Sequence, residues 1–389
     1  MARLIPAVVL SAAIVSWAVC LVVRHVAARY GFVDRPGERK IHARPIPTGG
    51  GLGIWAGVVL PLAAAQLVLF LCRSDWIAPH TIPLVGEFLS RHAAGLWVQS
   101  IRLWTLLGLG TVLLILGLLD DRYSLDWRLR LGVEVLVALA TYAAGWRLTV
   151  FVQSQWLSLP LTVLWIVGLI NSFNMLDNMD GLSAGVAAIA AGLFGIVMAT
   201  VPDSMSGEGQ LFVAAFSFLF LGTLTGFLWH NRPPARLFMG DGGSYFVGFI
   251  MAAVTLTATF AGDQVPRHAI IAPLCVLAVP IYDTATVVAI RIRAGKSPFE
   301  GDKNHFSHRL VELGMTTTQA VLTVYLTTTA CGLGALLLYQ VDLIGAFVVV
   351  AMVGCMLSVI AVLEATARRS RRRDGDKSSS MIPNERHDA

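Results

Sequence analysis

Apolar residues occupy the chain in long unbroken runs, and polar residues gather in the short segments between them. The runs do not alternate between apolar and polar positions, which argues against strands. Most of them have about the 20 residues that an α-helix needs to cross a bilayer. The pattern therefore predicts eleven transmembrane helices, at residues 5–27, 49–72, 101–119, 131–146, 156–173, 181–201, 210–229, 243–261, 268–290, 319–338 and 342–363.

The composition agrees with a membrane protein. Hydrophobic residues make up 56% and charged residues 14% of the chain, and the mean hydropathy is +0.70. A soluble domain has about 25% charged residues. The five cysteines lie in or beside apolar runs without a close pair, which argues against a disulfide framework or a zinc site. The net charge of +5 is spread over several loops, so no nucleic-acid partner is expected.

The basic residues predict the orientation. With eleven helices, 22 of the 29 lysines and arginines fall in one set of loops and the C-terminal tail. Cytoplasmic loops carry the excess of such residues. The N-terminus is therefore predicted outside and the C-terminus in the cytoplasm. Residues 1–366 are predicted to form a single transmembrane domain, and the basic tail 367–389 is expected to be disordered.

The polar motifs all lie on the predicted cytoplasmic face. The first loop, Val33 to Gly51, contains Lys40, Thr48 and several glycines. Cations and backbone donors of this kind could surround phosphates. An ordinary positively charged loop is the alternative.

A second motif, Asp120-Asp121, ends the third apolar run. The pair could engage a metal, act as a base or meet a cationic partner. Anions at a helix C-terminus oppose the helix dipole at a cost of about 0.3–1 kcal/mol. A structural or functional role of the pair must offset this cost. The alternative is a solvated helix end paired with Arg122 or Arg128.

A third motif places Asn171, Asn174, Asp177 and Asp180 at steps of three. Neighbours at this spacing lie close together on a helix and can share one ligand. Helix capping explains Asp180 alone. Polar groups near membrane depth are expensive and indicate function.

The fourth motif is Asp241 among Gly240, Gly242 and Gly243 at the start of the eighth run. The glycines are expected to leave room for a ligand, and a helix N-terminus favours phosphate. A helix cap formed by Asp241 or Ser244 is the alternative.

The fifth motif is a short helix at 304–314, which places His305, His308 and Arg309 on one face. A second face, with Phe306, Leu310 and Leu313, suits a helix lying on the membrane surface. The cationic face would then bind a phosphate. The alternative is an interfacial helix whose histidines take no part in binding. Asp283, inside the ninth run, could neutralise a buried cation or line the site.

These five motifs, in this order, resemble the polyprenyl-phosphate N-acetylhexosamine-1-phosphate transferase family over residues 5–363. The first loop is more similar to the N-acetylglucosamine branch than to the muramoyl-pentapeptide branch. The resemblance implies that polyprenyl phosphate attacks the β-phosphate of a UDP-N-acetylhexosamine on the cytoplasmic face of the inner (plasma) membrane. UMP leaves in this reaction, the first membrane step of a cell-envelope polysaccharide. The protein could also assemble as a homodimer.

The resemblance also implies residue roles. Asn174 and Asp241 would bind Mg²⁺, with Mn²⁺ as a substitute, and Asp241 would be catalytic. Asp120 and Asp121 would position or activate the lipid phosphate. The substrate-binding residues would be Lys40, Thr48, Asn171, Asp177, Asp180, His305, His308 and Arg309. The family often has lysine near Arg130, and the histidine motif here is His-Phe-Ser-His.

Three other readings of the sequence are weighed against this one. A phospho-N-acetylmuramoyl-pentapeptide transferase would perform the same reaction type on another donor. A transporter would explain many helices with intramembrane polar residues, but these residues cluster at one face and no repeat is found. A CDP-alcohol phosphotransferase would carry an Asp-Gly-x-x-Ala-Arg run, which the sequence lacks.

Overall fold

The computed structural model describes residues 4–34, 45–82, 86–148, 154–200, 210–257, 266–298 and 305–380. In these ranges helices joined by turns and loops make up the fold, with one ribbon of two short antiparallel strands, β1 (Val33–Asp34) and β2 (Ile46–Pro47), in which Val33 pairs with Pro47. Lys40 lies outside the described residues.

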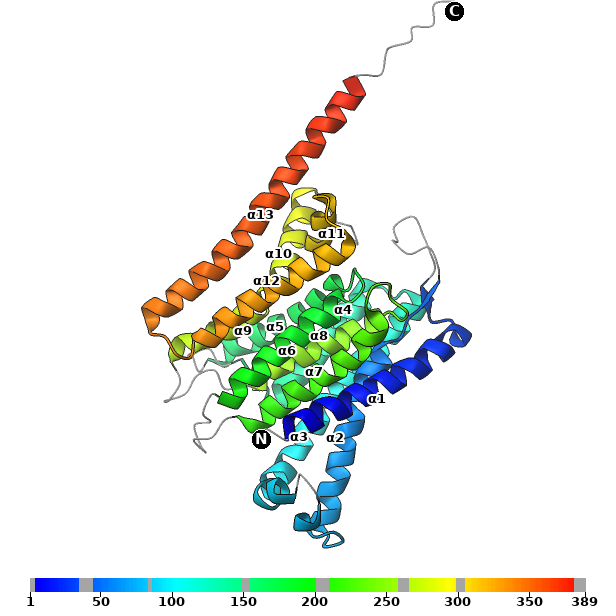
Figure 1. Cartoon of the computed structure of the whole chain (residues 1–389), viewed down its shortest axis with the longest axis vertical. Coiled ribbons are helices and arrows are strands. Elements are labelled where there is room, and N and C mark those ends of the chain that lie inside the picture. Colours follow the sequence, from blue (N-terminus) through cyan, green and yellow to red (C-terminus); the bar gives the residue numbers. More distant parts are fainter. Residues whose placement is uncertain are drawn as a thin grey trace, which may run out of the picture.

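The first eight α-helices carry most of the bundle (Figure 1). They are α1 (Leu4–Val26), α2 (Gly51–Arg73), α3 (Gly86–Tyr123), α4 (Trp127–Ala143), α5 (Gln155–Leu176), α6 (Leu182–Thr200), α7 (Leu211–Asn231) and α8 (Gly240–Thr257). The remaining five are α9 (Ala272–Val276), α10 (Ala278–Arg293), α11 (Phe306–Glu312), α12 (Thr317–Leu337) and α13 (Leu343–Ser380). Three 3₁₀ turns complete the structure: η1 (Ala27–Tyr30), η2 (Pro79–Thr81) and η3 (Arg267–Ile271).

Each predicted apolar segment is helical, so the all-α membrane fold is confirmed. Within the described ranges, eight helices are long and apolar enough to cross a bilayer, and a bent pair could form a ninth span. Two more predicted spans, α4 and α8, are helical without meeting both requirements. The count of eleven spans and the orientation of the bundle remain predictions.

The ninth predicted span is broken rather than continuous. The segment Arg267–Val276 meets α10 at an angle of 66°. Pro280 has no N–H to donate to the carbonyl of Val276, and its ring clashes with that carbonyl in a regular helix. The helix is interrupted at Leu277, which lies between the two residues that this hydrogen bond would join.

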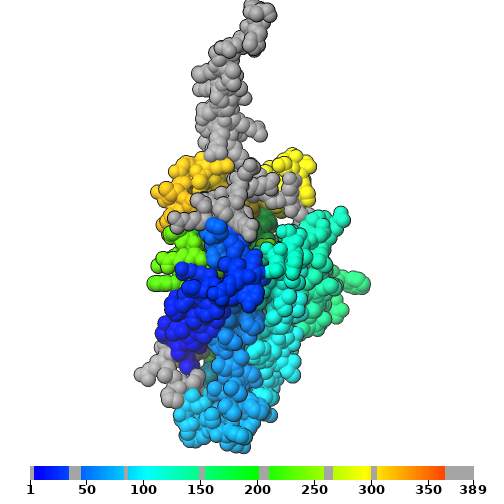
Figure 2. Space-filling model, turned by 90° about the vertical axis from the view of Figure 1, so that its right-hand side faces the viewer, coloured from blue at the N-terminus to red at the C-terminus, as the bar shows by residue number. Residues whose placement is uncertain are grey.

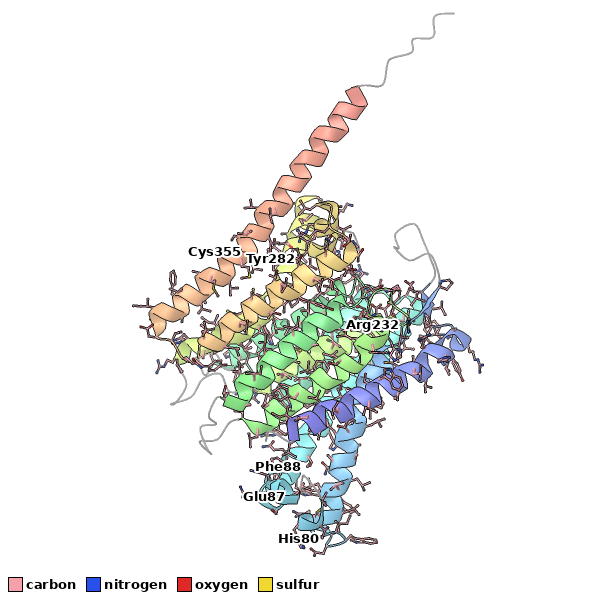
Figure 3. The ribbon with its side chains drawn as sticks, viewed as in Figure 1. His80, Glu87, Phe88, Arg232, Tyr282 and Cys355 are labelled. Carbon is pink, nitrogen blue, oxygen red and sulfur yellow. The ribbon has the colours of Figure 1, made fainter. Side chains whose placement is uncertain are left out.

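The centre of the bundle is α8, which packs against α3 and α5 and also contacts α2, α6 and α7. Its residues from Gly242 to Thr255 are all buried. The outer helices α1 and α13 instead expose large apolar side chains, which suits contact with lipid. Figure 2 shows α1 and α2 on one face of the molecule. The connection between α2 and α3, marked by His80, Glu87 and Phe88 in Figure 3, forms its lower end.

Glycines let the start of α8 enter between two other helices. A Cβ added to Gly117 of α3 would overlap the backbone of Gly242, and one added to Gly51 of α2 would overlap Gly243. The expectation that Gly242 and Gly243 leave room for a ligand is therefore wrong. They leave room for neighbouring helices, because backbones this close tolerate no side chain between them.

The last helix, α13, continues beyond its apolar residues and stands away from the bundle in Figure 1. Its backbone is helical as far as Ser380, into the segment for which the charged composition predicts no fixed structure. Residues 381–389 lie outside the described part of the chain. The boundary between a catalytic domain and a tail near residue 366 remains a prediction.

Candidate active site

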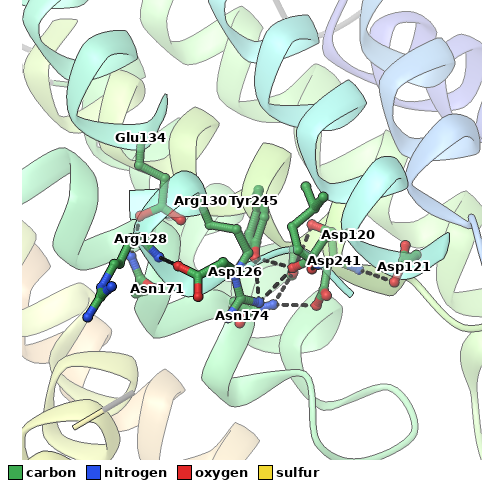
Figure 4. A network of polar contacts seen from close by, with 12 residues as sticks. Asp120, Asp121, Asp126, Arg128, Arg130, Glu134, Asn171, Asn174, Asp241 and Tyr245 are labelled. Atoms are coloured by element: carbon green, nitrogen blue, oxygen red, sulfur yellow. Dashed lines mark hydrogen bonds and ion pairs between the residues drawn. The ribbon is translucent and has the colours of Figure 1, made fainter. Parts of the chain in front are cut away.

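Three helix ends meet at one cluster of polar side chains (Figure 4). Asp120 and Asp121 lie in the last turn of α3, Asn174 in the last turn of α5, and Asp241 in the first turn of α8. The glycine contacts that wedge α8 against α3 bring these ends together. Residues from three widely separated parts of the sequence thus share one site.

Asp241 is held from both neighbouring helices. The Asn174 side-chain amide donates to Asp241 Oδ1 at 2.7 Å and to Ser244 Oγ at 3.0 Å. The backbone N–H of Asp241 donates to Asp121 Oδ1 at 3.0 Å. This N–H is one of the groups that the start of a helix leaves without an intrahelical partner, so Asp121 caps α8.

The two adjacent aspartates have different surroundings. Asp120 is 4% exposed and accepts three hydrogen bonds, from Arg130 at 2.6 Å, Leu125 N at 2.8 Å and Tyr245 OH at 3.0 Å. Asp121 Oδ2 is buried and has no hydrogen-bond partner among the described residues. A buried carboxylate oxygen without a partner is costly, so it marks a place for a ligand. Asp120 is saturated, whereas Asp121 has a free oxygen.

Asp177, which follows the last residue of α5, adds a further carboxylate. Burial, followed by the nearby carboxylates of Asp241, Asp121 and Asp180, raises the pKa of Asp177 to about 8. Several carboxyl groups thus lie close together at this point, and their mutual repulsion disfavours the charged forms. A cation placed among them would relieve this repulsion.

The oxygen donors fit a hard cation such as Mg²⁺. Carboxylate and amide oxygens are its protein ligands, and phosphates or water usually complete the shell. Within the described ranges no three histidine, cysteine or acidic side chains are arranged to hold an ion by themselves. The free Asp121 oxygen, Asp241 and a turned Asn174 amide would then share the ion with a phosphate-bearing substrate. Whether the protein uses Mg²⁺ remains a prediction.

Two members of the third motif have structural partners. Asn171 donates to Glu134 Oε2 of α4 at 2.5 Å and to the carbonyl of Val167 at 2.9 Å. Asp180 accepts from Ala235 N at 2.8 Å, which ties the turn after α5 to the loop before α8. Their role in substrate binding remains a prediction.

The helix α11 is largely buried within the protein, although Leu313, just after its end, is exposed. Phe306 is 0% exposed and Leu310 is buried, while His305 and Arg309 turn inward. The expected face of three exposed cations is therefore wrong, and only the His308 side chain is partly exposed. The reason is a buried partner, Asp283 of α10, whose carboxylate lies 3.0 Å from His305 Nδ1 and 3.7 Å from the Arg309 guanidinium. Asp283 thus lies beside a buried cation, Arg309, in agreement with one of the two roles that the sequence left open.

Thr48 lies beside the loop that leads into α8. Its backbone N–H donates to Phe32 O at 3.1 Å, and Phe238 N of that loop donates to Pro47 O at 2.9 Å. Gly50 N in turn donates to Phe238 O at 2.9 Å. The first loop is therefore attached next to Asp241, although the Thr48 side chain shows no specific contact with it.

Two residues of the site, Glu134 and Tyr245, were not predicted from the sequence. Glu134 is 1% exposed in α4 and bonds to Asn171, and Tyr245 of α8 bonds to Asp120. A carboxylate within a predicted span was a signal for Glu134, because intramembrane acidic residues are rare. For Tyr245 the sequence carried no signal, since a tyrosine in an apolar run is common.

Comparisons with known proteins show to which family the chain is similar. Residues 103–259 match the model of glycosyl transferase family 4. The chain is 30% identical to the "Probable undecaprenyl-phosphate N-acetylglucosaminyl 1-phosphate transferase" of Bacillus subtilis strain 168, over 78% of this chain and 76% of the relative. It is 30% identical to the decaprenyl-phosphate N-acetylglucosaminephosphotransferase of Mycolicibacterium smegmatis, over 82% and 78%.

A third relative is the undecaprenyl-phosphate alpha-N-acetylglucosaminyl 1-phosphate transferase of Escherichia coli K12, 26% identical over 78% of this chain and 75% of the relative. The matched region contains every residue of the polar cluster from Asp120 to Asp241. The similarity extends over most of the length of these relatives, well beyond a single motif. The chain therefore belongs to glycosyl transferase family 4, in the branch of the polyprenyl-phosphate N-acetylglucosamine-1-phosphate transferases.

Proposed function

We propose that this enzyme transfers N-acetylglucosamine 1-phosphate from UDP-N-acetylglucosamine to a polyprenyl phosphate. A phosphate oxygen of the lipid bonds to the β-phosphorus of the donor, and the bond from that phosphorus to the bridging oxygen breaks. UMP leaves with that oxygen, and the sugar stays on a lipid-linked diphosphate. The names of the relatives and the polar cluster support the proposal.

The observation that carries the proposal is the crowding of carboxylates around the free oxygen of Asp121. Two anionic substrates cannot approach such a site without a cation between them. We propose Mg²⁺, with Mn²⁺ as a substitute, bound by Asp241, Asn174 and Asp121 together with donor phosphates. When bound, the ion would shield the phosphates and stabilise the charge on the leaving UMP.

The two aspartates then have separate tasks. Asp120 accepts hydrogen bonds from three donors and so holds Arg130 and Tyr245 in place. Asp121 caps α8 and offers its free oxygen to the reacting groups. A phosphate monoester has its second pKa near 6 and is mostly ionised at pH 7. The acceptor therefore needs positioning more than a base.

The proposed setting is the cytoplasmic face of the plasma membrane, with eleven spans and the N-terminus outside. The distribution of the basic residues supports this orientation. The acceptor cannot leave the bilayer, which agrees with a site at helix ends instead of mid-membrane. UDP-N-acetylglucosamine would reach the site from the cytoplasm.

A donor panel tests the proposal. Purified protein, undecaprenyl phosphate and Mg²⁺ are incubated with single UDP-sugars, and UMP release is measured. UDP-N-acetylglucosamine is expected to give the fastest release. Faster release from UDP-N-acetylmuramoyl-pentapeptide would assign the chain to the other branch of the reaction. No UMP from any donor would contradict the proposed reaction.

A further inference from the structure

Asp283 is a buried carboxylate of α10 outside the cluster of Asp120, Asp121 and Asp241. Its side chain is 1% exposed. Oδ1 accepts from the backbone N–H of Phe306 at 2.5 Å, and Oδ2 lies 3.0 Å from His305 Nδ1. The Arg309 guanidinium lies 3.7 Å away and donates to Thr286 Oγ1 at 2.9 Å. One carboxylate thus contacts two residues of α11 and the residue before it.

These contacts decide where α11 lies. The helix has seven residues, too few to be stable in isolation. The Phe306 N–H that Asp283 accepts is among those that a helix start leaves without an intrahelical partner. Beside it, the ring of Tyr282, which Figure 3 labels, packs edge-on against the ring of Phe306 at 6.0 Å between centroids. Asp283 therefore fixes both the start and the rotation of α11.

A second attachment joins α11 to the carboxylate cluster. Ser307 Oγ donates to Asn178 Oδ1 at 2.6 Å. Asn178 directly follows Asp177, the residue at the C-terminal end of α5 beside Asn174. The helix α11 is thus held between α10 on one side and the turn that carries Asp177 on the other.

The orientation of the histidines follows from these attachments. His305 uses Nδ1 toward Asp283, so the geometry of imidazole directs Nε2 to the opposite side of the ring. His308 lies one turn further, with 6.3 Å between the two ring centroids. Two imidazoles at this separation can contact neighbouring oxygens of a diphosphate.

We propose that Asp283 is a positioning residue for the nucleotide-sugar donor. Through His305 and the first turn of α11 it aims the imidazoles of His305 and His308 at the donor diphosphate. The inference rests on the proposed function, since that function supplies the diphosphate. It assigns Asp283 no contact with the substrate.

Steady-state kinetics of Asp283→Asn, His305→Ala and the double variant test the proposal in the full-length protein. For Asp283→Asn the KM for UDP-N-acetylglucosamine is expected to rise about tenfold, with the KM for polyprenyl phosphate nearly unchanged. Because Asp283 acts through His305, the double variant should be much less impaired than the product of the two single effects. Multiplicative effects, or equal rises in both KM values, would overturn the proposal.

Two further variants separate positioning from folding. Asp342 also caps a helix, since its carboxylate accepts from Gly345 N at 2.8 Å, but it is exposed at the start of α13. Asp342→Asn is the matched control and should leave both KM values unchanged. If Asp283→Asn does not fold, Ser307→Ala removes only the second attachment and is expected to raise the donor KM selectively. An unchanged donor KM in Ser307→Ala would then refute the proposal.

The activity of the wild-type protein separates the proposed function from the proposed role of Asp283. UMP release by the wild type with the predicted substrates supports the function whatever Asp283 does. Multiplicative effects in an active enzyme refute only the role of Asp283. An inactive wild type instead refutes the proposed function.

Discussion

The substitution Gly240→Ala tests how the structure positions Asp121. Gly240 has φ +74°, in the left-handed region, and an added Cβ would overlap Asp121 Oδ2 and lie 3.1 Å from its carboxylate carbon. The left-handed conformation costs a residue with a Cβ about 1–2 kcal/mol. The overlap also forces the carboxylate to move by about 1 Å to reach ordinary contact distance.

Gly145→Ala is the matched control. Gly145 has φ +98° and nothing within 4 Å of the added Cβ. Alanine at this position therefore has the cost of the left-handed backbone without contacting any neighbour. Both variants should lose a similar, modest amount of stability. Only Gly240→Ala should lose about 10²-fold in turnover, the effect expected when a group at the reaction centre is misplaced by about 1 Å.

Turnover is measured as UMP release, and stability as the thermal midpoint in the same detergent. The comparison is made after both variants have been shown to be monodisperse. If the turnover of Gly240→Ala lies within about threefold of that of Gly145→Ala, turnover does not depend on the present position of the Asp121 carboxylate, and its proposed role is wrong.

Three further predictions follow from the site and its orientation. Asp241→Asn should abolish Mg²⁺-dependent turnover without lowering the thermal midpoint, because a neutral amide is a poorer ligand for a hard cation; wild-type turnover that resists a chelator would contradict this. Asp121→Asn should lose turnover nearly independently of pH above about 7, and recovery of about tenfold in alkali would make Asp121 a base. Cysteines replacing Ala2 and Glu385 should react from outside only at position 2; the opposite labelling would reverse the orientation.

The helices could be predicted from the sequence because hydrocarbon demands long apolar runs with all backbone groups paired internally. The same patterns located the end of α3, the end of α5 and the start of α8, where Asp121, Asn174 and Asp241 meet. Charge and hydropathy are properties of short segments, so a single sequence reports them directly. The family resemblance, on these same motifs, is confirmed by the relatives.

Other features depend on contacts between distant segments and escaped prediction. The amphipathic pattern of α11 suits a membrane surface or a protein interior equally well, and the position of Asp283 decides between them. The tasks of Gly242 and Gly243 depend on Gly117 and Gly51, more than 100 residues away in sequence. The neighbouring sequence does not distinguish a glycine that lies beside a ligand from a glycine that packs against another helix.

The most direct test of the central claim follows the β-phosphate. UDP-N-acetylglucosamine labelled at that phosphate is incubated with the purified protein, undecaprenyl phosphate and Mg²⁺. If the enzyme transfers a sugar 1-phosphate, the label passes into the lipid fraction and one UMP is released for each lipid labelled. Release of labelled UDP, or a lipid fraction without label, would contradict transfer of a sugar 1-phosphate.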